Sequence, residues 1–309
     1  MESSMFAEVG TSGDQVKSLV AGASELPDAT ANEEESGPLA GPGKYPGIGC
    51  WGGIEEEGYH ASPGISQSRL KLHRKAEAKA FAPFKETTAL RLGSVIHCAL
   101  LEPDEVELRY QPSELKQFNA AHKAYQAELE VAKAAGRTLV KKADLEDALR
   151  LRDRVLANST VAALLAPGQL EIEQSFWWHD EETQLLCRGR ADAIRQDWRC
   201  LIDIKSTEDA SLDKFKWSVR DYGYYWQDPF YKDGIEATRG WRPESCFFIA
   251  VEKDEPNLAA VYEIEPSHVR LGHDEVHAQL RAFAECERTG IWRGYPEGIQ
   301  LIPAGNIPL

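Results

Sequence analysis

Short apolar runs separated by polar breaks dominate the second half of the chain. Residues 171–178 alternate as in a half-buried strand, and residues 187–194 and 200–204 are apolar runs on either side of a polar break at 196–199. On this pattern we predict strands at 170–179, 184–195, 199–205, 246–251 and 259–264.

Most of the remaining length has helical character. The apolar run Thr88 to Leu101 predicts a buried helix, and Ser66 is a suitable N-cap for a helix in the segment from Tyr59 to Ala82. Further helices are predicted at 112–135, at 142–165, at 212–238 with interruptions near Gly223 and Pro229, and at 266–288. Strands interspersed with helices indicate an α/β fold.

The composition divides the chain into a tail and a globular region. Residues 1–45 are rich in Gly, Ser, Ala and Glu, which is typical of disorder. Residues 46–309 are predicted to form a single domain with a helical insertion around 112–165. With 309 residues, of which 42% are hydrophobic, the chain can bury a large core.

Several classes of protein are not indicated. No apolar run reaches the ~18 residues of a transmembrane helix. The N-terminus lacks a basic segment followed by an apolar core, so no secretory signal is expected. The six cysteines are scattered without a C-x-x-C pair, so the cysteines indicate neither a zinc site nor a disulfide framework. These features favour the reducing cytoplasm.

The net charge of −15 is distributed unevenly. Residues 1–57 hold eleven Asp and Glu against two Lys, a local net charge of −9. Residues 58–92 hold seven Lys and Arg against two Glu, a local net charge of +5. A basic patch beside an acidic site is typical of proteins that act on nucleic acid. The alternative is that this run is one solvated helix face.

Two carboxylates and a lysine lie on neighbouring predicted strands. Asp203 and Lys205 are two residues apart and leave the same face of their strand. A hairpin would bring Asp192, on the preceding strand, to the same end of the sheet as Asp203. Buried charges are normally paired or bound to a metal, and carboxylate oxygens suit Mg²⁺ or Mn²⁺. A structural ion pair between Asp203 and Lys205 is the alternative.

Three further features extend this candidate site. His97 lies in the apolar helix and could be a metal ligand or a core histidine. Gln227 and Tyr231 are four residues apart and share one helix face, within an aromatic segment that could equally fill a core. Glu173 could supply a third carboxylate or be an ordinary exposed strand residue.

The order of these motifs resembles a known family. A Ser-x-Ser-Arg-Leu segment (Ser66 to Leu70) is followed by G-x-x-x-H, G-x-x-D, D-x-K and Q-x-x-x-Y, within the region from Tyr59 to Tyr295. This order resembles the PD-(D/E)xK nuclease superfamily in its RecB-like branch, and within it the exonuclease VIII (RecE-like) exodeoxyribonucleases of phages and prophages. The resemblance implies a restriction-endonuclease-like α/β core, with a mixed central sheet flanked by helices and with helical elaborations.

The resemblance also implies a role for each candidate residue. The implied metal ligands are His97, Asp192, Asp203, the carbonyl of Ile204 and, with a less certain alignment, Glu173. Lys205 would be the catalytic lysine, acting with Asp192 and Asp203, and Gln227 and Tyr231 would organise the site and contact DNA. Further DNA contacts are expected at Ser66, Ser68, Arg69, Lys71 and Arg190, and Arg69 is the candidate for a phosphate contact.

The implied activity is a Mg²⁺-dependent exodeoxyribonuclease, with Mn²⁺ able to substitute and without an iron–sulfur cluster. It would degrade linear double-stranded DNA from its ends, 5′ to 3′, and leave 3′ single strands for recombination. The implied partners are double-stranded DNA ends, a single-strand annealing recombinase and further copies of the chain, as a ring such as a tetramer. No membrane partner is expected, and the expected location is the cytoplasm of a bacterium or a phage-infected host.

Two alternatives stay open at this point. One is an endonuclease or single-strand nuclease of the same superfamily. The other is a non-catalytic DNA-binding scaffold that keeps the fold.

Overall fold

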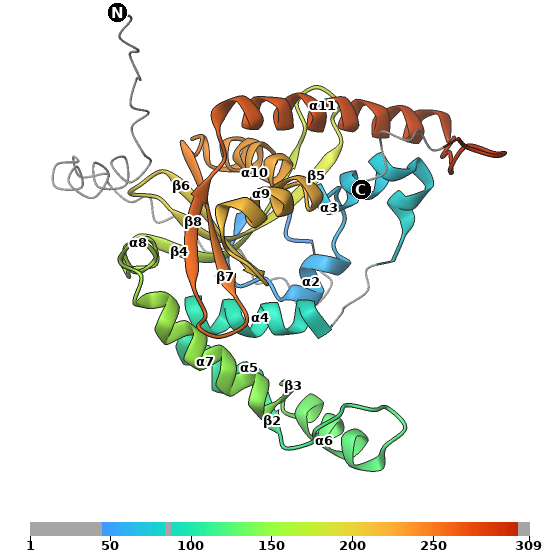
Figure 1. Ribbon diagram of the computed structural model, residues 1–309. Helices are drawn as coiled ribbons and strands as arrows, with labels where there is room; N and C mark the ends of the chain where they lie inside the picture. The colour runs from blue at the N-terminus through green and yellow to red at the C-terminus, as the bar shows by residue number, and fades with distance from the viewer. Residues whose placement is uncertain (1–44, 84–87, 302–309) are drawn as a thin grey trace, which may run out of the picture.

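A six-stranded mixed sheet forms the centre of the protein (Figure 1). The computed structural model describes residues 45–83 and 88–301, so nearly all of the predicted disordered tail lies outside the described residues. The strands, in spatial order, are β1 (Gly49–Trp51), β4 (Leu170–His179), β5 (Leu186–Arg195), β6 (Cys200–Thr207), β7 (Ser245–Glu252) and β8 (Ala259–Glu263). β6 and β7 are parallel, and the other neighbouring pairs in this sheet are antiparallel.

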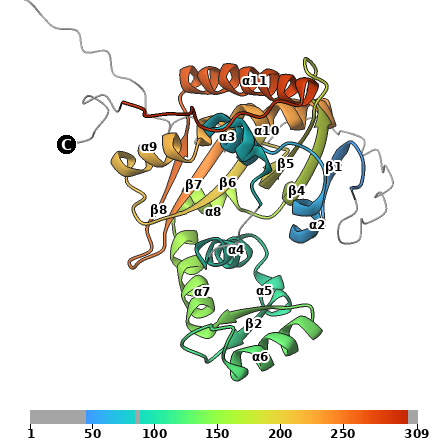
Figure 2. The same cartoon turned by 90° about the vertical axis from the view of Figure 1, so that its right-hand side faces the viewer.

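Helices cover both faces of the sheet. Parallel neighbours need a crossover, and α9 (Leu212–Asp221) and α10 (Tyr224–Arg239) provide it between β6 and β7. Together with α3 (Gln67–Lys75) and α11 (Pro266–Thr289) they cover one face, where Phe176, Trp226 and Phe248 are buried. α4 (Thr88–Leu101), α7 (Lys142–Leu156) and α8 (Ser159–Leu164) cover the other face, over Ile202 and Ile249 (Figures 1 and 2). The predicted fold class is therefore confirmed.

The region predicted as a helical insertion is more varied than its sequence pattern indicates. Its helices are α6 (Lys123–Ala134), α7 and α8, and β2 (Tyr110–Ser113) and β3 (Thr138–Lys141) form a small parallel pair. The helix predicted for 112–135 is therefore wrong up to residue 122, since 112–113 belong to β2 and 114–122 form a loop. Buried Tyr110 and Val140 anchor the pair, because β-branched and aromatic residues suit a pleated, half-buried surface. Figure 2 shows α6 and these strands projecting away from the main sheet.

The N-terminal part of the described chain joins the sheet edge to α4. It contains α2 (Glu56–Ala61), α3 and the 3₁₀ turn η1 (Glu77–Phe81), and after α4 come η2 (Pro103–Glu105) and α5 (Val106–Arg109). The Ser66 hydroxyl caps α3, accepting a hydrogen bond from the Arg69 amide at 3.3 Å, so the predicted helix start is confirmed.

The predicted interruption of α10 at Pro229 is wrong, whereas the one at Gly223, with φ of 66°, is confirmed. Pro229 has no N–H to bond the carbonyl of Tyr225, four residues earlier. The structure places Gly272 of α11 against this carbonyl, so closely that a side-chain carbon at Gly272 would lie 1.8 Å from the oxygen. The proline therefore leaves α10 intact and exposes one carbonyl at its crossing with α11.

None of the described helices combines the length and the apolar character that a membrane span requires.

Candidate active site

The candidate site is built where the ladder between β4 and β5 is broken. Ile172 pairs with Ala193 and Gln174 with Ala191, but the intervening residues, Glu173 and Asp192, do not pair, and Glu173 has φ of 51°. Side chains two residues apart on a regular strand share one face of the sheet. On β4, however, Leu170 and Ile172 pack on the α4 side, whereas Phe176 and Trp178 pack on the α10 side, so the strand turns over at the break. A non-glycine residue in this conformation is uncommon and is often found at functional sites.

Three groups suited to metal binding meet at this break. The ligand atoms of His97, Glu173 and Asp192 all lie within 4.8 Å of one another, and the Nδ1 atom of His97 is 3.5 Å from Oδ2 of Asp192. They come from α4, β4 and β5, and each is partly buried. Imidazole and carboxylate together suit divalent cations such as Mg²⁺, Mn²⁺ and Zn²⁺.

Asp203 and Lys205 form the second half of the site. They leave the same face of β6, as predicted, and Nζ of Lys205 lies 2.5 Å from Oδ2 of Asp203. Gln227 of α10 bridges the pair, since its Nε2 donates to Asp203 and its Oε1 accepts from Lys205 at 3.1 Å. Only 6% of the Asp203 side chain is exposed, so this is a charged contact inside the protein.

A backbone hydrogen bond joins the two halves. The ladder places Ala193 opposite Ile202, so Asp192 and Asp203 lie one position further along, at the same end of the sheet, as predicted. The Ile204 amide donates to Oδ2 of Asp192 at 2.7 Å. The pKa of Asp192 is raised to about 7, mainly by burial and to a smaller degree by the neighbouring Asp203 and Glu173 carboxylates, against the opposing effect of His97.

The ammonium of Lys205 is held in its charged form. Burial alone lowers the pKa of a lysine, but the Asp203 carboxylate outweighs this effect and raises the pKa of Lys205 above its ordinary value. The ammonium also lies 4.6 Å from the centre of the Tyr224 ring, a cation–π contact that sequence reasoning missed. Tyr224 belongs to the aromatic segment whose role the sequence left open, and its position three residues before Gln227 on α10 is the signal that could have found it.

Tyr231 lies on the face of α10 that Gln227 occupies, as the spacing predicts. Its ring contacts Phe176 edge-on, with centroids 5.4 Å apart, and burial raises the pKa of its hydroxyl well above the ordinary range. Gln227 therefore reaches the pair on β6, while the Tyr231 ring packs against Phe176 of β4. Both side chains come from one helix, but of the two only Gln227 forms hydrogen bonds with Asp203 and Lys205 in the described part of the chain.

The residues predicted to contact DNA have varied surroundings. Arg190 forms an ion pair with Glu173 at 2.5 Å and donates to the Ile54 carbonyl at 2.8 Å. Arg69 donates to the Ala80 carbonyl at 2.9 Å, and Ser66 is the cap of α3. Their contacts to DNA stay predictions, because these groups also have structural partners in the protein.

The other two residues predicted to contact DNA are Ser68 and Lys71, and their contacts to DNA also stay predictions. Ser68 is exposed. The ammonium of Lys71 donates to the Tyr222 carbonyl, and burial, with the nearby Lys205 charge, lowers the pKa of Lys71 to about 8. α3 therefore brings a second lysine close enough to Lys205 for their charges to interact.

The donor set fits a divalent metal ion. Oδ2 of Asp203 is buried and, among the described residues, accepts no hydrogen bond of good geometry, although the Lys205 ammonium lies beside it. Burial and, to a smaller degree, the Asp203 and Glu173 carboxylates raise the pKa of Asp192, so a bound cation would favour its ionised form. Asp203 is not part of the group that His97, Glu173 and Asp192 form, and its carboxylate is turned towards Lys205 and Gln227.

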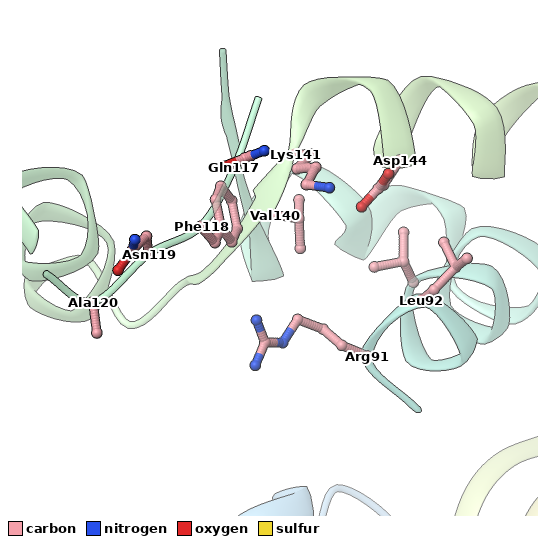
Figure 3. A pocket seen from close by; sticks show the side chains of 10 residues that line it. Arg91, Leu92, Gln117, Phe118, Asn119, Ala120, Val140, Lys141 and Asp144 are labelled. Atoms are coloured by element: carbon pink, nitrogen blue, oxygen red, sulfur yellow. The ribbon is translucent and has the colours of Figure 1, made fainter. Parts of the chain in front are cut away.

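A cavity of about 500 Å³ lies between α4 and the projecting region (Figure 3). Its wall combines basic, aromatic and amide side chains, namely Arg91, Gln117, Phe118, Asn119 and Lys141. Arg91 is on the same helix as His97, six residues away, which corresponds to roughly 9 Å along the axis. The sequence did not single out Phe118 or Asn119, which lie in the loop before α6 where helix was predicted.

Comparisons with known proteins agree with the fold described above. A putative exonuclease from Eubacterium rectale has a similar structure, with a TM-score of 0.53 and 12% identity over 79% of this chain and 94% of that chain. Weaker similarities are to a phage-related exonuclease from Haemophilus somnus 129PT (TM-score 0.31, 11% identity, 68% and 98% covered) and to an alkaline exonuclease from Laribacter hongkongensis (TM-score 0.27, 17% identity, 65% and 94% covered). No curated protein matches the sequence.

The mixed sheet with flanking helices defines a PDDEXK-like protein. Residues 66–304 match the family described as a PDDEXK-like domain of unknown function (DUF3799), and the chain belongs to this family. The predicted membership of the PD-(D/E)xK superfamily is confirmed by the family match, and the solved structure from Eubacterium rectale shares the fold.

Proposed function

We propose that the protein is a metal-dependent exodeoxyribonuclease that hydrolyses linear double-stranded DNA from its ends. One observation carries the proposal. His97, Glu173 and Asp192 converge beside the Asp203, Lys205 and Gln227 cluster, at one end of two adjacent strands of a PDDEXK-like fold. A structural ion pair alone gives no reason for the other carboxylates and the imidazole to gather there.

A divalent ion bound here would lower the pKa of a water molecule and neutralise charge on the scissile phosphate. His97, Asp192, Asp203 and Glu173 are the side chains that would hold it. Lys205, kept protonated by Asp203, supplies a fixed positive charge for the phosphate as negative charge develops on it. Gln227, on α10, forms hydrogen bonds with both Asp203 and Lys205 and so fixes their side chains. The Lys205 ammonium is therefore already in position when the reaction begins.

The path of the DNA is proposed from the distribution of basic and aromatic groups. Lys71 and the exposed start of α3 lie on the Lys205 side, and the cavity with Arg91, Phe118 and Lys141 lies beyond α4. Cationic and aromatic side chains together suit a nucleic-acid strand, through phosphate contacts and base stacking. The projecting region would thus form one wall of the DNA channel.

The finer features of the activity are proposed on the family resemblance. They are Mg²⁺ as the working ion, digestion from 5′ to 3′, delivery of 3′ single strands to an annealing recombinase, and a homo-oligomeric ring in the bacterial or phage-infected cytoplasm. A closed ring would remain linked to its DNA, which favours processive digestion.

The test is digestion of a 5′-phosphorylated linear duplex, labelled at either end of one strand, with Mg²⁺ and with EDTA, beside a covalently closed circle. We expect metal-dependent release of nucleotides from the 5′ end and no cleavage of the circle. Release from the 3′ end would reverse the polarity. Cleavage of the circle would indicate an endonuclease, and no cleavage of any DNA with Mg²⁺ or Mn²⁺ would indicate a binding scaffold.

A further inference from the structure

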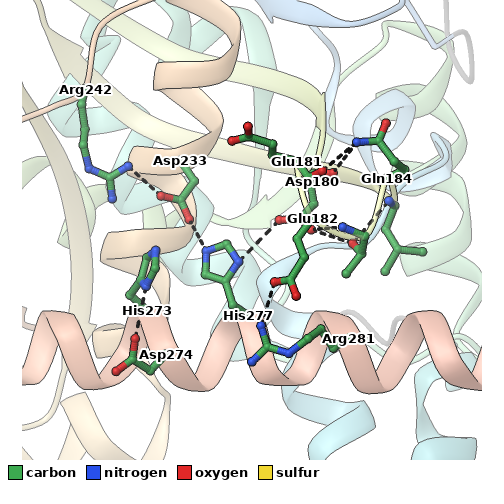
Figure 4. Close-up of polar contacts among 12 residues, drawn as sticks. Asp180, Glu181, Glu182, Gln184, Asp233, Arg242, His273, Asp274, His277 and Arg281 are labelled. Atoms are coloured by element: carbon green, nitrogen blue, oxygen red, sulfur yellow. Dashed lines mark hydrogen bonds and ion pairs between the residues drawn. The ribbon is translucent and has the colours of Figure 1, made fainter.

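A second cluster of ligand-type side chains lies at the far end of β4 from Glu173. Asp180 directly follows β4, seven residues after Glu173, which corresponds to roughly 20 Å along an extended strand. Beside it lie Asp233 of α10 and two histidines of α11, His273 and His277 (Figure 4). None of these residues belongs to the candidate active site.

The geometry of this cluster is that of a three-ligand site. The ligand atoms of Asp233, His273 and His277 all lie within 4.8 Å of one another. The two histidines are four residues apart on one face of α11, and their ring centroids are 4.2 Å apart. Nε2 of His277 is 3.2 Å from Oδ2 of Asp233, and its Nδ1 is 3.6 Å from Oδ1 of Asp180.

Neighbouring groups hold the ligand atoms in place. Arg242 donates to Oδ1 of Asp233 at 2.7 Å, which leaves Oδ2 directed at His277. Such outer hydrogen bonds orient the ligands of metal sites. Thr183 bonds Asp180 through its amide and hydroxyl at 2.8 and 2.6 Å, so this second carboxylate is also fixed.

The backbone beneath the histidines is equally constrained. Gly272, the residue before His273, packs against the Tyr225 carbonyl that Pro229 leaves without a partner. This contact fixes the crossing of α10 and α11 and therefore the distance between Asp233 and the two histidines. Pro229 therefore influences the position of Asp233, which lies one turn further along α10, because it leaves free the carbonyl against which Gly272 packs.

The cluster opens onto solvent through a cavity of about 450 Å³. The cluster and the cavity together contain five carboxylates and two guanidinium groups. The carboxylates belong to Asp180, Glu181, Glu182, Asp233 and Asp274, and the guanidinium groups to Arg242 and Arg281. An excess of negative charge raises the local concentration of cations. Two imidazoles with one carboxylate form a donor set that suits Zn²⁺ and related transition metals better than Mg²⁺.

We propose that Asp233, His273 and His277 form a second metal site, specific for Zn²⁺-class ions, which ties α10 to α11. Asp180 lies close enough to accept a hydrogen bond from a metal-bound water or to complete the ligand set. Because α10 also carries Gln227, the ion stabilises the helix that organises the candidate active site. The proposal does not depend on nuclease activity, since its ligands and its readout are separate from that site.

The test is competition for Zn²⁺ between a chromophoric chelator and the full-length chain without an affinity tag. His273→Ala is the principal variant, because this side chain is half exposed and its loss leaves no cavity. His268→Ala removes another exposed histidine of α11 and is the matched control. Asp192→Asn is included to separate the second site from the active site.

We expect His273→Ala to weaken one class of Zn²⁺ binding by about 100-fold or more, and His268→Ala and Asp192→Asn to retain that class. Zn²⁺ should also raise the melting temperature of the wild type and of His268→Ala, but not that of His273→Ala. Co²⁺ should give absorption bands of low-symmetry coordination that His273→Ala loses. Wild-type Zn²⁺ affinity in His273→Ala, or loss of all Zn²⁺ binding in Asp192→Asn, would overturn the proposal.

Discussion

The two ends of β4 carry charged clusters of opposite electrostatic character. At Glu173, carboxylates face one another and the pKa of Asp192 rises to about 7, mainly through burial. At Asp180, burial also opposes ionisation of Asp233, but hydrogen bonds from His277 and Arg242 outweigh it and lower the pKa of Asp233. The pKa of Asp192 thus stays raised although Lys205 and Arg190 pair with its neighbours Asp203 and Glu173, whereas the ionised form of Asp233 is stabilised by its own partners.

This difference separates sites that require a cation from sites that accommodate one. Carboxylates gathered without enough partners destabilise the fold until an ion binds, and evolution retains such an arrangement where function needs the ion. Carboxylates already paired with arginine and histidine contribute to stability without an ion. Oxygen-rich ligands at the first end favour Mg²⁺ or Mn²⁺, and nitrogen-rich ligands at the second favour Zn²⁺.

The largest effect is expected from removing the lysine of the first end, which pairs with Asp203. Lys205→Ala should lower the rate of DNA hydrolysis about 10³-fold, as for the loss of one group that stabilises transition-state charge. It also leaves Asp203 buried without its partner, so the melting temperature in EDTA should fall and metal should restore it. Lys214→Ala, at an exposed position of α9, is the control and should keep the wild-type rate. A wild-type rate in Lys205→Ala would remove Lys205 from the mechanism.

Gln227 allows a finer perturbation of the same cluster. Gln227→Ala should lower the hydrolysis rate by about 10- to 100-fold, since the residue orients Asp203 and Lys205 without supplying charge. The pH at which the rate is half-maximal should shift as well, because Asp203 and Lys205 lose a shared partner. Gln196→Ala in the exposed β5–β6 turn is the matched control. If Gln227→Ala changed stability and left rate and pH profile intact, the residue would be only a packing element.

Opposite responses to pH would sharpen the comparison itself. Asp192 has a raised pKa, so ionising it destabilises the metal-free protein increasingly from about pH 4 and fully above about pH 7. Asp192→Asn should therefore stabilise the metal-free protein at about pH 8, by up to about 4 kcal/mol. Asp233 has a lowered pKa, so its ionised form stabilises the fold above the usual carboxyl range, and Asp233→Asn should destabilise the protein there. Chemical denaturation in EDTA across this pH range measures the change in unfolding free energy for both variants. A change of the same sign in Asp192→Asn and Asp233→Asn would refute the comparison.

The smallest effect is expected in the cavity beyond α4. Lys141→Ala should weaken DNA binding several-fold and reduce the slope of log affinity against log salt by about 1, as for the loss of one phosphate contact. Fluorescence anisotropy with a catalytically inactive variant measures this. Lys133→Ala, an exposed residue of α6, is the control. An unchanged salt slope in Lys141→Ala would place the DNA elsewhere.

The sequence predicted best where local pattern and chemistry agree. Apolar runs located β4 to β8 to within a few residues, because buried strands require them. The spacing of Asp203 and Lys205 placed both on one face, and the hairpin placed Asp192 beside them. Gln227 was also singled out, because the four-residue interval to Tyr231 defines a helix face.

The remaining features depend on contacts between distant segments. Pro229 was taken as an interruption because the Gly272 contact that accommodates it comes from α11. The left-handed backbone at Glu173 has no local signal, since glutamate does not favour that conformation. His273 and His277 received no role, because a histidine pair becomes a ligand pair only when Asp233 lies opposite. The strands β2 and β3 pair across an intervening helix and were missed for the same reason.

The most direct test of the central claim compares the two ends of β4 in one assay. Hydrolysis of a linear duplex is followed as a function of Mg²⁺ concentration for the wild type, Asp192→Asn and His273→Ala. The account predicts loss of hydrolysis in Asp192→Asn and a wild-type rate and Mg²⁺ dependence in His273→Ala. Undiminished hydrolysis by Asp192→Asn would contradict the assignment of the oxygen-rich cluster as the hydrolytic centre.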